Sequence, residues 1–273
     1  MRIDNFRIAR DTLDVRWCQQ NVLADQMKVA AYQAPLLAEG SMDAIELMQR
    51  RVRECELNGI SVLCCPEAIL GGLADSSAQP GEFAIRTDDG QLASVLAPLS
   101  SETVTSIIGF TELGPDGALY NAAAVFQSGR VGGLYRKIHP ALRYSKYSSG
   151  CETPVFRAGE LTFGIVICND SNYPELPRRM AIQGATALFI PTNNGLAHRR
   201  ASLKVNAAAR ITDVALATES QLWVIRADVA GRNRKLTCFG CSEIVDPQGE
   251  VVQQGRYEQE DLLVASIELK KLS

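Results

Sequence analysis

The sequence predicts an α/β fold in which a mixed sheet, or two sheets, lies beneath covering helices. Short apolar runs typical of buried strands alternate with amphipathic helical segments, and one longer stretch has the pattern of a hairpin. No internal repeat or low-complexity linker interrupts this order, so residues 27–273 are expected to form one domain. Residues 1–26 are polar with weak periodicity and are treated as an N-terminal appendage.

In the N-terminal half, continuous apolar runs indicate strands and apolar residues at helical spacing indicate helices. The expected strands span 27–36, 60–65 and 103–113, the hairpin spans 119–139, and the helices span 42–57 and 90–99. Asn58 and Gly59 end the first helix because both residues suit a left-handed cap. Ser128 and Gly129 mark the turn of the hairpin.

The C-terminal half continues the same alternation with shorter elements. The expected strands span 161–168, 185–192, 220–229, 241–247 and 261–269, and the helices span 176–183 and 201–218. Some strands are separated by helices and others follow one another directly. This combination favours mixed sheets over an all-parallel sheet.

The composition excludes several classes of partner. The net charge is -3 and the basic residues are scattered, so neither nucleic acid nor an anionic membrane is expected to bind. No apolar run is long enough to cross a bilayer, and the N-terminus lacks the hydrophobic stretch of a secretory signal. These features favour a cytoplasmic location.

The eight cysteines are expected to be reduced thiols in that location. Cys238 and Cys241 form one CxxC pair, but no second pair or neighbouring histidine completes a zinc site. We therefore expect structural thiols in a strand and no metal.

The segment FGIVICNDSNYPE, residues 163–175, runs apolar up to Cys168 and then turns polar. A free cysteine packs well as a small hydrophobe, so Cys168 is either a core thiol or a nucleophile displayed at a strand end. CCPE and GLYRKIHP deliver Glu67 and Lys137 in the same way, at the ends of apolar runs. Functional groups of α/β sheets collect outside such ends.

These three residue types make chemical sense together. Glu67 would accept the thiol proton, and Lys137 and the backbone amide after Cys168 would stabilise an oxyanion. Each residue also has an ordinary interpretation, since a lone Glu often caps a loop and a lone Lys is usually exposed. A histidine base is the other possibility, but neither spacing nor context distinguishes His139 from His198.

Several motifs in this chain occur in a known family order. They are Pro66-Glu67, Gly109-Phe110-Thr111-Glu112, Tyr120-Asn121, Tyr135-Arg136-Lys137-Ile138-His139, Cys168 with Asp170, Tyr173-Pro174-Glu175 and Arg178, Pro191-Thr192-Asn193-Asn194, and Asp246-Pro247-Gln248-Gly249. The combination resembles the nitrilase, or carbon-nitrogen hydrolase, superfamily from about residue 27 to residue 272.

The resemblance implies a four-layer αββα sandwich of two mixed sheets and a Glu67, Lys137, Cys168 triad that needs no cofactor. It implies hydrolysis of a non-peptide C–N bond through an acyl-enzyme on the cysteine. Asn169, Asp170, Tyr173, Asn193 and Asn194 are the implied residues around the substrate or the triad. The resemblance also implies a homodimer.

Asp170, Glu175 and Arg178 are expected either to organise the turn after Cys168 by pairing or to form a surface ion pair.

The residues after the nucleophile bear on the substrate. Asn169-Asp170 differs from the Trp-Glu-Asn of typical nitrilases and looks like the D-carbamoylases. Ser171 and Asn172 replace two arginines that grip a substrate carboxylate in those enzymes. A small, uncharged or weakly polar amide is therefore expected, although Arg199 or Arg200 could reach the pocket from another loop. An N-carbamoyl amino acid or a nitrile is the alternative substrate.

Arg143 stands where many family members have a second glutamate. Arg143 either points to solvent, binds an anionic group of the substrate, or impairs the site, and an impaired site would leave a binding protein. Glu112 or Glu152 could replace the missing carboxylate in space.

Overall fold

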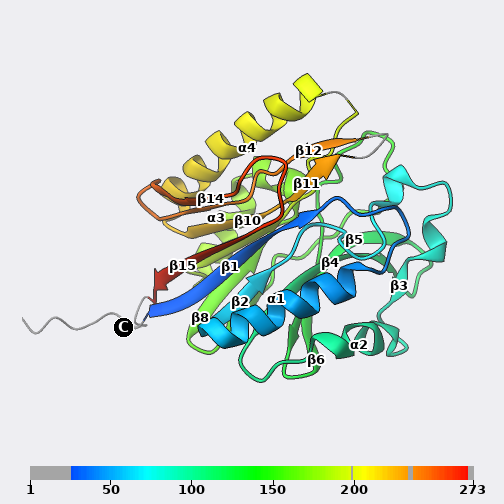
Figure 1. Ribbon diagram of the computed structural model, residues 1–273, viewed down its shortest axis with the longest axis horizontal. Helices are drawn as coiled ribbons and strands as arrows, with labels where there is room; N and C mark the ends of the chain where they lie inside the picture. Colours follow the sequence, from blue (N-terminus) through cyan, green and yellow to red (C-terminus); the bar gives the residue numbers. More distant parts are fainter. Residues whose placement is uncertain (1–25, 198, 233–235, 270–273) are drawn as a thin grey trace, which may run out of the picture.

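Two mixed β-sheets pack face to face in the computed structural model, with helices outside both of them (Figure 1). The structure describes residues 26–197, 199–232 and 236–269. The larger sheet contains β1 Gln26–Pro35, β2 Ile60–Cys64, β3 Ile85–Arg86, β4 Thr105–Leu113, β5 Leu119–Gln127, β6 Arg130–Arg136, β11 Val229–Arg232, β12 Thr237–Phe239 and β15 Asp261–Glu268. The smaller sheet contains β7 Val155–Ala158, β8 Leu161–Ile165, β9 Ala187–Pro191, β10 Trp223–Ala227, β13 Glu243–Val245 and β14 Val251–Gln254.

The strand directions in the larger sheet bring the ends of several strands to one edge. β1, β2 and β4 are parallel, β5 returns antiparallel to β4, and β6 is antiparallel to β5. β2, β4 and β6 therefore run the same way and end at the same edge. β15, drawn in red, lies antiparallel to β1, drawn in blue (Figure 1).

The smaller sheet is parallel at its centre and antiparallel at its margins. β8, β9 and β10 are parallel, whereas β7 and β13 pair antiparallel to β8 and β10. The chain passes directly from β10 in this sheet to β11 in the larger one. The carboxyl ends of β8, β9 and β10 thus lie close to the larger sheet.

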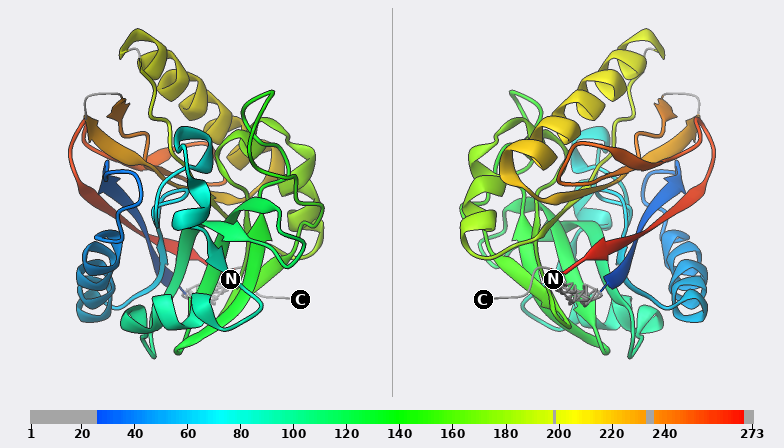
Figure 2. Two further views of the ribbon diagram at one scale, coloured as in Figure 1. Left: turned by 90° about the vertical axis from the view of Figure 1, so that its right-hand side faces the viewer. Right: turned by 90° about the vertical axis from the view of Figure 1, so that its left-hand side faces the viewer.

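The four α-helices form the outer layers, α1 on one side and α3 and α4 on the other (Figure 2). They are α1 Ala44–Asn58, α2 Gln91–Leu96, α3 Glu175–Ile182 and α4 Arg199–Ser220, and the short 3-10 helices are η1 Ala74–Ser76, η2 Pro80–Glu82, η3 Ala97–Leu99 and η4 Cys168–Asn172. α1 ends at Gly59, whose φ of 65° is the left-handed cap conformation.

Alternating side chains of β1 show how the core is divided. Val29 and Ala31 face the smaller sheet, and Ala30 and Tyr32 face α1. Met48 on α1 fills the outer cluster with no exposed surface. Because each face of the central strands is covered, their sequences are almost continuously apolar.

The predicted α/β class and the arrangement of two mixed sheets with flanking helices are confirmed. The hairpin turn at Ser128 and Gly129 is also as expected, with both residues at positive φ. The single strand predicted over 220–229 is wrong, because Asp228 divides it into β10 and β11, which belong to different sheets. Short strands β3, β7, β12 and β14 were not predicted.

Residues 1–25 of the predicted appendage lie outside the described residues, and Gln26 begins β1. Within the described part of the chain, no helix combines the length and apolar character needed to cross a bilayer.

Candidate active site

Glu67, Lys137 and Cys168 meet at the strand ends where the two sheets face each other. Glu67 follows β2 and Lys137 follows β6, so both come from the same edge of the larger sheet. Cys168 begins η4, the 3-10 helix that comes after β8 of the smaller sheet. The charges of Glu67 and Lys137 both influence the pKa of the Cys168 thiol. The structure therefore brings together the three residues that the sequence placed at strand ends.

The carboxylate of Glu67 is held by three donors and is only 2% exposed. Its Oε1 accepts hydrogen bonds from Lys137 Nζ at 2.5 Å and from Asn121 Nδ2 at 2.7 Å. Its Oε2 accepts the backbone N–H of Asn193 at 2.9 Å. A Cβ at Gly109 would lie 2.4 Å from the Pro66 carbonyl oxygen, so this glycine lets the Glu67 segment approach β4. The carboxylate is fixed but retains lone pairs for a proton.

Lys137 is a buried cation beside that carboxylate. Burial alone lowers the pKa of Lys137, but the negative charge of Glu67 and its hydrogen bond with the ammonium outweigh this effect and raise the pKa. The ammonium therefore stays charged at neutral pH. A fixed positive charge beside a half-buried sulfur can stabilise negative charge that develops there.

Cys168 is the first residue of η4 and has a strained backbone conformation. Its φ of 47° is unusual for a residue with a Cβ. Burial and the nearby charge of Glu67 raise the pKa of the thiol to about 12, against the opposing charge of Lys137. The thiol is therefore protonated at neutral pH and needs a base to become a nucleophile.

Asp170 locks the turn that carries Cys168. Its carboxylate, with no exposed surface, accepts the hydroxyl of Tyr135 at 2.7 Å and the backbone N–H groups of His139 at 2.7 Å and Ile167 at 3.2 Å. One carboxylate thus connects the cysteine turn to the residues beside Lys137. Burial raises the pKa of Asp170, although these donors oppose the rise.

In the described part of the chain, Asp170, Glu175 and Arg178 show no pairing with one another, and Arg178 instead takes part in a surface ion pair, which was the other alternative. Arg178 donates to Glu219 on α4 at 2.8 Å, and both side chains are about half exposed. Asp170 uses neutral donors instead, because a buried carboxylate can be satisfied by backbone N–H and hydroxyl groups.

Two asparagines after β9 contact the proposed triad. Asn194 Oδ1 lies 3.7 Å from the sulfur of Cys168 as its hydrogen-bond acceptor, and the Nδ2 of Asn194 is buried without a partner among the described residues. The backbone of Asn194 is fixed by its N–H bond to Asp228 at 3.0 Å. Asn193 holds Glu67 through its backbone, as described above. Asn193 and Asn194 thus contact Glu67 and Cys168, and their role toward a substrate stays a prediction.

Asn169 and Tyr173 connect the turn after Cys168 to His139. Asn169 Nδ2 donates to the His139 carbonyl at 3.1 Å, and the Tyr173 ring stacks on the His139 ring with centroids 3.5 Å apart. His139 is thus held against Tyr173, and its backbone atoms bond to Asp170 and Asn169. His198, the other histidine considered as a base, lies outside the described residues.

Glu112 and Arg143 do not join Glu67 and Lys137. The Glu112 carboxylate accepts two hydrogen bonds from Arg136, both at 2.7 Å, and one from Thr87. Arg136 precedes Lys137, so their side chains point to opposite faces of the sheet. Arg143 is exposed and lies over the Tyr144 ring, which matches the solvent-facing alternative. Glu152 is also exposed.

Sequence reasoning missed the side chains that support the site from behind. Asn121 was matched only as part of a motif, and Arg226 with its partner Asp213 was not considered. The signal for Arg226 was present, because a charged residue interrupts the apolar run WVIRA. Buried charges are rare unless they are paired, so this position predicts a partner.

The CxxC cysteines are buried, as expected for structural thiols. Cys238 lies in β12, and the Cys241 thiol donates to the Asn206 carbonyl at 3.4 Å. The described residues contain no cluster of three or more His, Cys, Asp or Glu side chains that could hold a metal ion.

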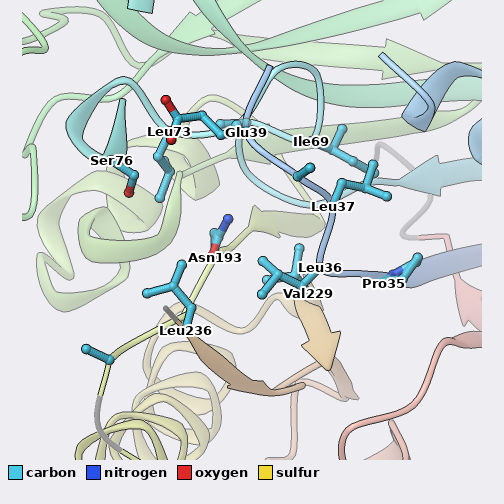
Figure 3. A pocket seen from close by; sticks show the side chains of 14 residues that line it. Pro35, Leu36, Leu37, Glu39, Ile69, Leu73, Ser76, Asn193, Val229 and Leu236 are labelled. Atoms are coloured by element: carbon cyan, nitrogen blue, oxygen red, sulfur yellow. The ribbon is translucent and has the colours of Figure 1, made fainter. Parts of the chain in front are cut away.

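A cavity of about 570 Å³ (Figure 3) is lined by neighbours of Glu67, although Glu67, Lys137 and Cys168 are not themselves among its lining residues. Ala68 and Asn193, which line it, are the residue after Glu67 and the residue bonded to its carboxylate. Most other lining side chains are aliphatic; they include Leu36, Leu37, Ile69, Leu73, Val229 and Leu236. Glu39 and Ser76 add polar groups. The cavity is large enough for a small organic molecule.

Asp228 predicts a pH dependence of stability. Burial raises its pKa from 3.8 to about 6, although backbone N–H groups of Asn194 and Val229 oppose the rise. A raised pKa means that its stabilising contribution is complete below about pH 3.8 and is lost as pH rises through about 6. We expect Asp228→Asn to gain about 3 kcal/mol relative to wild type between these limits.

The measurement is urea unfolding of wild type and Asp228→Asn from about pH 4 to pH 7. Asp116→Asn is the control, because the Tyr120 hydroxyl lowers the pKa of Asp116 from 3.8 and its difference from wild type should therefore stay nearly constant in this pH range. A difference between wild type and Asp228→Asn that does not change with pH would contradict the assignment.

Comparisons with known proteins identify similar sequences and a shared fold. The carbon-nitrogen hydrolase family model matches residues 28–273. A protein named "Hydrolase in pqqF 5'region" from Pseudomonas protegens is 29% identical over 82% of this chain and 76% of its own length. N-carbamoylputrescine amidase from Solanum lycopersicum is 31% identical over 57% of each chain. The crystal structure of a carbon-nitrogen hydrolase from Helicobacter pylori G27 shares the fold, with a TM-score of 0.78, 22% identity and 90% coverage of both chains.

Proposed function

The chain belongs to the carbon-nitrogen hydrolase family, and on that premise we propose that it hydrolyses a small amide to a carboxylate and ammonia. The observation that carries the proposal is the buried Lys137–Glu67 pair facing the half-buried thiol of Cys168. Glu67 is the base, Cys168 the nucleophile and Lys137 the fixed cation.

In the first half-reaction, Glu67 takes the thiol proton as the sulfur of Cys168 attacks the carbonyl carbon of the amide. The carbonyl oxygen becomes an oxyanion, which Lys137 Nζ and the backbone N–H of Asn169 stabilise. When the C–N bond breaks, Glu67 returns the proton to the leaving nitrogen. Ammonia departs, and the acyl group remains on sulfur as a thioester.

In the second half-reaction, Glu67 takes a proton from a water molecule that attacks the thioester carbon. The same two donors stabilise the second oxyanion. Collapse breaks the C–S bond, the sulfur regains its proton from Glu67, and the product leaves as a carboxylic acid that loses its remaining proton to solvent. Each proton that Glu67 accepts is thus returned within its half-reaction, and no cofactor enters the scheme.

Product analysis separates this activity from its alternatives. An amidase releases ammonia and a carboxylate, whereas an N-carbamoyl substrate releases ammonia with carbon dioxide and an amine. A nitrile consumes two waters for each ammonia. We expect ammonia without carbon dioxide from simple amides; ammonia accompanied by carbon dioxide, or turnover of nitriles alone, would replace the amide assignment.

The cavity beside Glu67 supports an apolar acyl group. Its lining is mainly aliphatic, and the carboxylate of Glu39 disfavours an anionic substrate. Burial of one methylene is worth about 0.8 kcal/mol, so kcat/KM should rise about fourfold for each CH₂ added to a straight-chain amide until the cavity is filled.

Leu73→Trp tests this placement, because the larger ring would occupy the cavity. We expect it to remove the gain for longer amides while the shortest amide is hydrolysed nearly as well as by wild type. Leu57→Trp, on a side chain 87% exposed at the end of α1, is the matched control. An unchanged chain-length profile in Leu73→Trp would show that the acyl group binds elsewhere.

The homodimer stays a prediction. Ile182 on α3 and Ile211 on α4 are 86% and 73% exposed, which gives both outer helices apolar surface.

A further inference from the structure

Arg226 is a buried arginine behind the proposed active site. It lies on β10 with 1% of its surface exposed, and its partner Asp213 on α4 has none. Arg226 Nε donates to Asp213 Oδ2 at 2.6 Å, and Nη2 donates to Oδ1 of the same carboxylate. One side of the guanidinium is therefore paired with a carboxylate. The N–H groups on its other side can donate to two further partners.

The first of these partners links Arg226 to the turn of Cys168. Arg226 Nη2 donates to Ser171 Oγ at 3.1 Å, and Ser171 Oγ donates to the carbonyl oxygen of Cys168 at 2.8 Å. Ser171 lies within η4, which begins at Cys168. The backbone of the nucleophile, at a strained φ of 47°, is thus held from behind through one hydroxyl.

The second partner links Arg226 to the residues that hold Glu67. Arg226 Nη1 donates to Thr192 Oγ1 at 2.8 Å, and the Thr192 carbonyl accepts the backbone N–H of Glu67 at 3.3 Å. The next residue, Asn193, donates its own N–H to the Glu67 carboxylate at 2.9 Å. One planar group therefore contacts both the segment of the nucleophile and the segment that orients the base.

We propose that Arg226, fixed by Asp213, is a positioning residue that sets the distance between the Cys168 turn and the Glu67 carboxylate through Ser171 and Thr192. This inference rests on the proposed function for its effect on hydrolysis. In the described part of the chain, the Arg226 side chain bonds to Asp213, Ser171 and Thr192 and to none of the three proposed triad residues. It acts as a rigid brace between β10, η4 and the end of β9.

The chemistry of the side chain fits this role better than a role in stability. A buried ion pair often contributes no more to folding than apolar residues of similar volume, because both charges lose their hydration. A guanidinium, however, presents several N–H donors in a fixed plane, which a lysine ammonium cannot reproduce. Contacts with three separate segments use that plane.

Two small substitutions test the two arms of the brace without removing a charge. Ser171→Ala breaks the link to the Cys168 carbonyl, and Thr192→Val breaks the link toward Glu67. Ser202→Ala and Thr218→Val are the matched controls. Among the described residues, the buried Ser202 hydroxyl has no hydrogen-bond partner, and the Thr218 hydroxyl bonds only carbonyls of its own helix α4.

For each arm variant we expect kcat to fall on the order of 10- to 100-fold, since small displacements of catalytic groups have effects of this size. KM should change by less than about threefold, because the cavity that binds substrate is untouched. For Ser171→Ala, iodoacetamide should also alkylate Cys168 more slowly at every pH. The control variants should match wild type in all three measurements.

A third variant replaces the ion pair as a whole. Arg226→Met with Asp213→Leu removes both charges and keeps most of the volume, so the protein should remain folded. The kcat of this double variant should fall as far as in the arm variants. The single variant Arg226→Lys, which keeps the charge but not the planar set of donors, should also show a reduced kcat. The proposal is overturned if the folded double variant retains wild-type kcat. It is equally overturned if the arm variants lower the melting temperature but leave kcat and alkylation unchanged.

The alkylation measurement needs no substrate. If wild type hydrolyses no amide, the proposed function fails, yet the rates of Cys168 alkylation in wild type and Ser171→Ala still decide whether the brace positions the thiol.

Discussion

Replacement of Cys168 by alanine should lower amide hydrolysis by about 10⁴-fold or more, because no other group can form the acyl-enzyme. The protein should remain folded, since the thiol is only half-buried and makes one weak hydrogen bond, to Asn194. The measurement is ammonia release together with the melting temperature of the purified variant. Intact-protein mass spectrometry should then find no acyl adduct after incubation with amide.

Cys151→Ala is the matched control for this result. Cys151 is exposed on the segment before β7, and its loss should leave hydrolysis unchanged. If Cys168→Ala retains wild-type ammonia release, Cys168 is not the nucleophile. The protein would then be a hydrolase that works through another group.

Glu67→Gln should lower hydrolysis by about 10³-fold or more while it preserves the shape of the site. Glutamine can still accept a hydrogen bond from Lys137 or Asn121, but it cannot take the thiol proton or return it to the leaving nitrogen. KM should change far less than kcat, because the substrate cavity is lined by other residues. Steady-state kinetics with a single amide measures both parameters.

Glu152→Gln provides the control, since this carboxylate is exposed near the start of β7. Circular dichroism of Glu67→Gln checks that the variant is folded. Loss of folding would leave kcat uninformative, and in that case Glu67→Asp, which keeps the charge but shortens the side chain, should show a smaller loss of activity. Full activity in folded Glu67→Gln would remove Glu67 from the mechanism.

The sequence predicted the central strands because burial on both faces leaves continuous apolar runs such as ISVLC in β2. It missed β14 because all four residues of VVQQ are exposed and carry no core pattern. The division of the predicted strand 220–229 into β10 and β11 at Asp228 was also missed. The chain stays extended on both sides of Asp228, and the strands that pair with β10 and β11 are remote in sequence.

The candidate site was predictable to the extent that it lies at strand ends. Glu67, Lys137 and Cys168 each follow an apolar run, but that local signal is weak alone, and the resemblance to the family selected them. The partners of these residues depend on strand register, which one sequence does not reveal. Glu112 illustrates this limit, because pairing with Arg136 places it on the face opposite Lys137. Arg226 required knowledge of which segments pack behind the cysteine turn.

The central claim is that a carboxylate and an ammonium both face the sulfur of Cys168, and the pH dependence of its alkylation tests that claim most directly. Rates with iodoacetamide would be measured between about pH 7 and pH 10, with the modified residue identified by mass spectrometry. Glu67 raises the pKa of Cys168 and Lys137 lowers it. Lys137→Met should therefore shift the alkylation profile to higher pH than in wild type, and adding Glu67→Gln should shift it back toward lower pH. Identical alkylation profiles in wild type and both variants would contradict the account, because neither charge would then face the thiol.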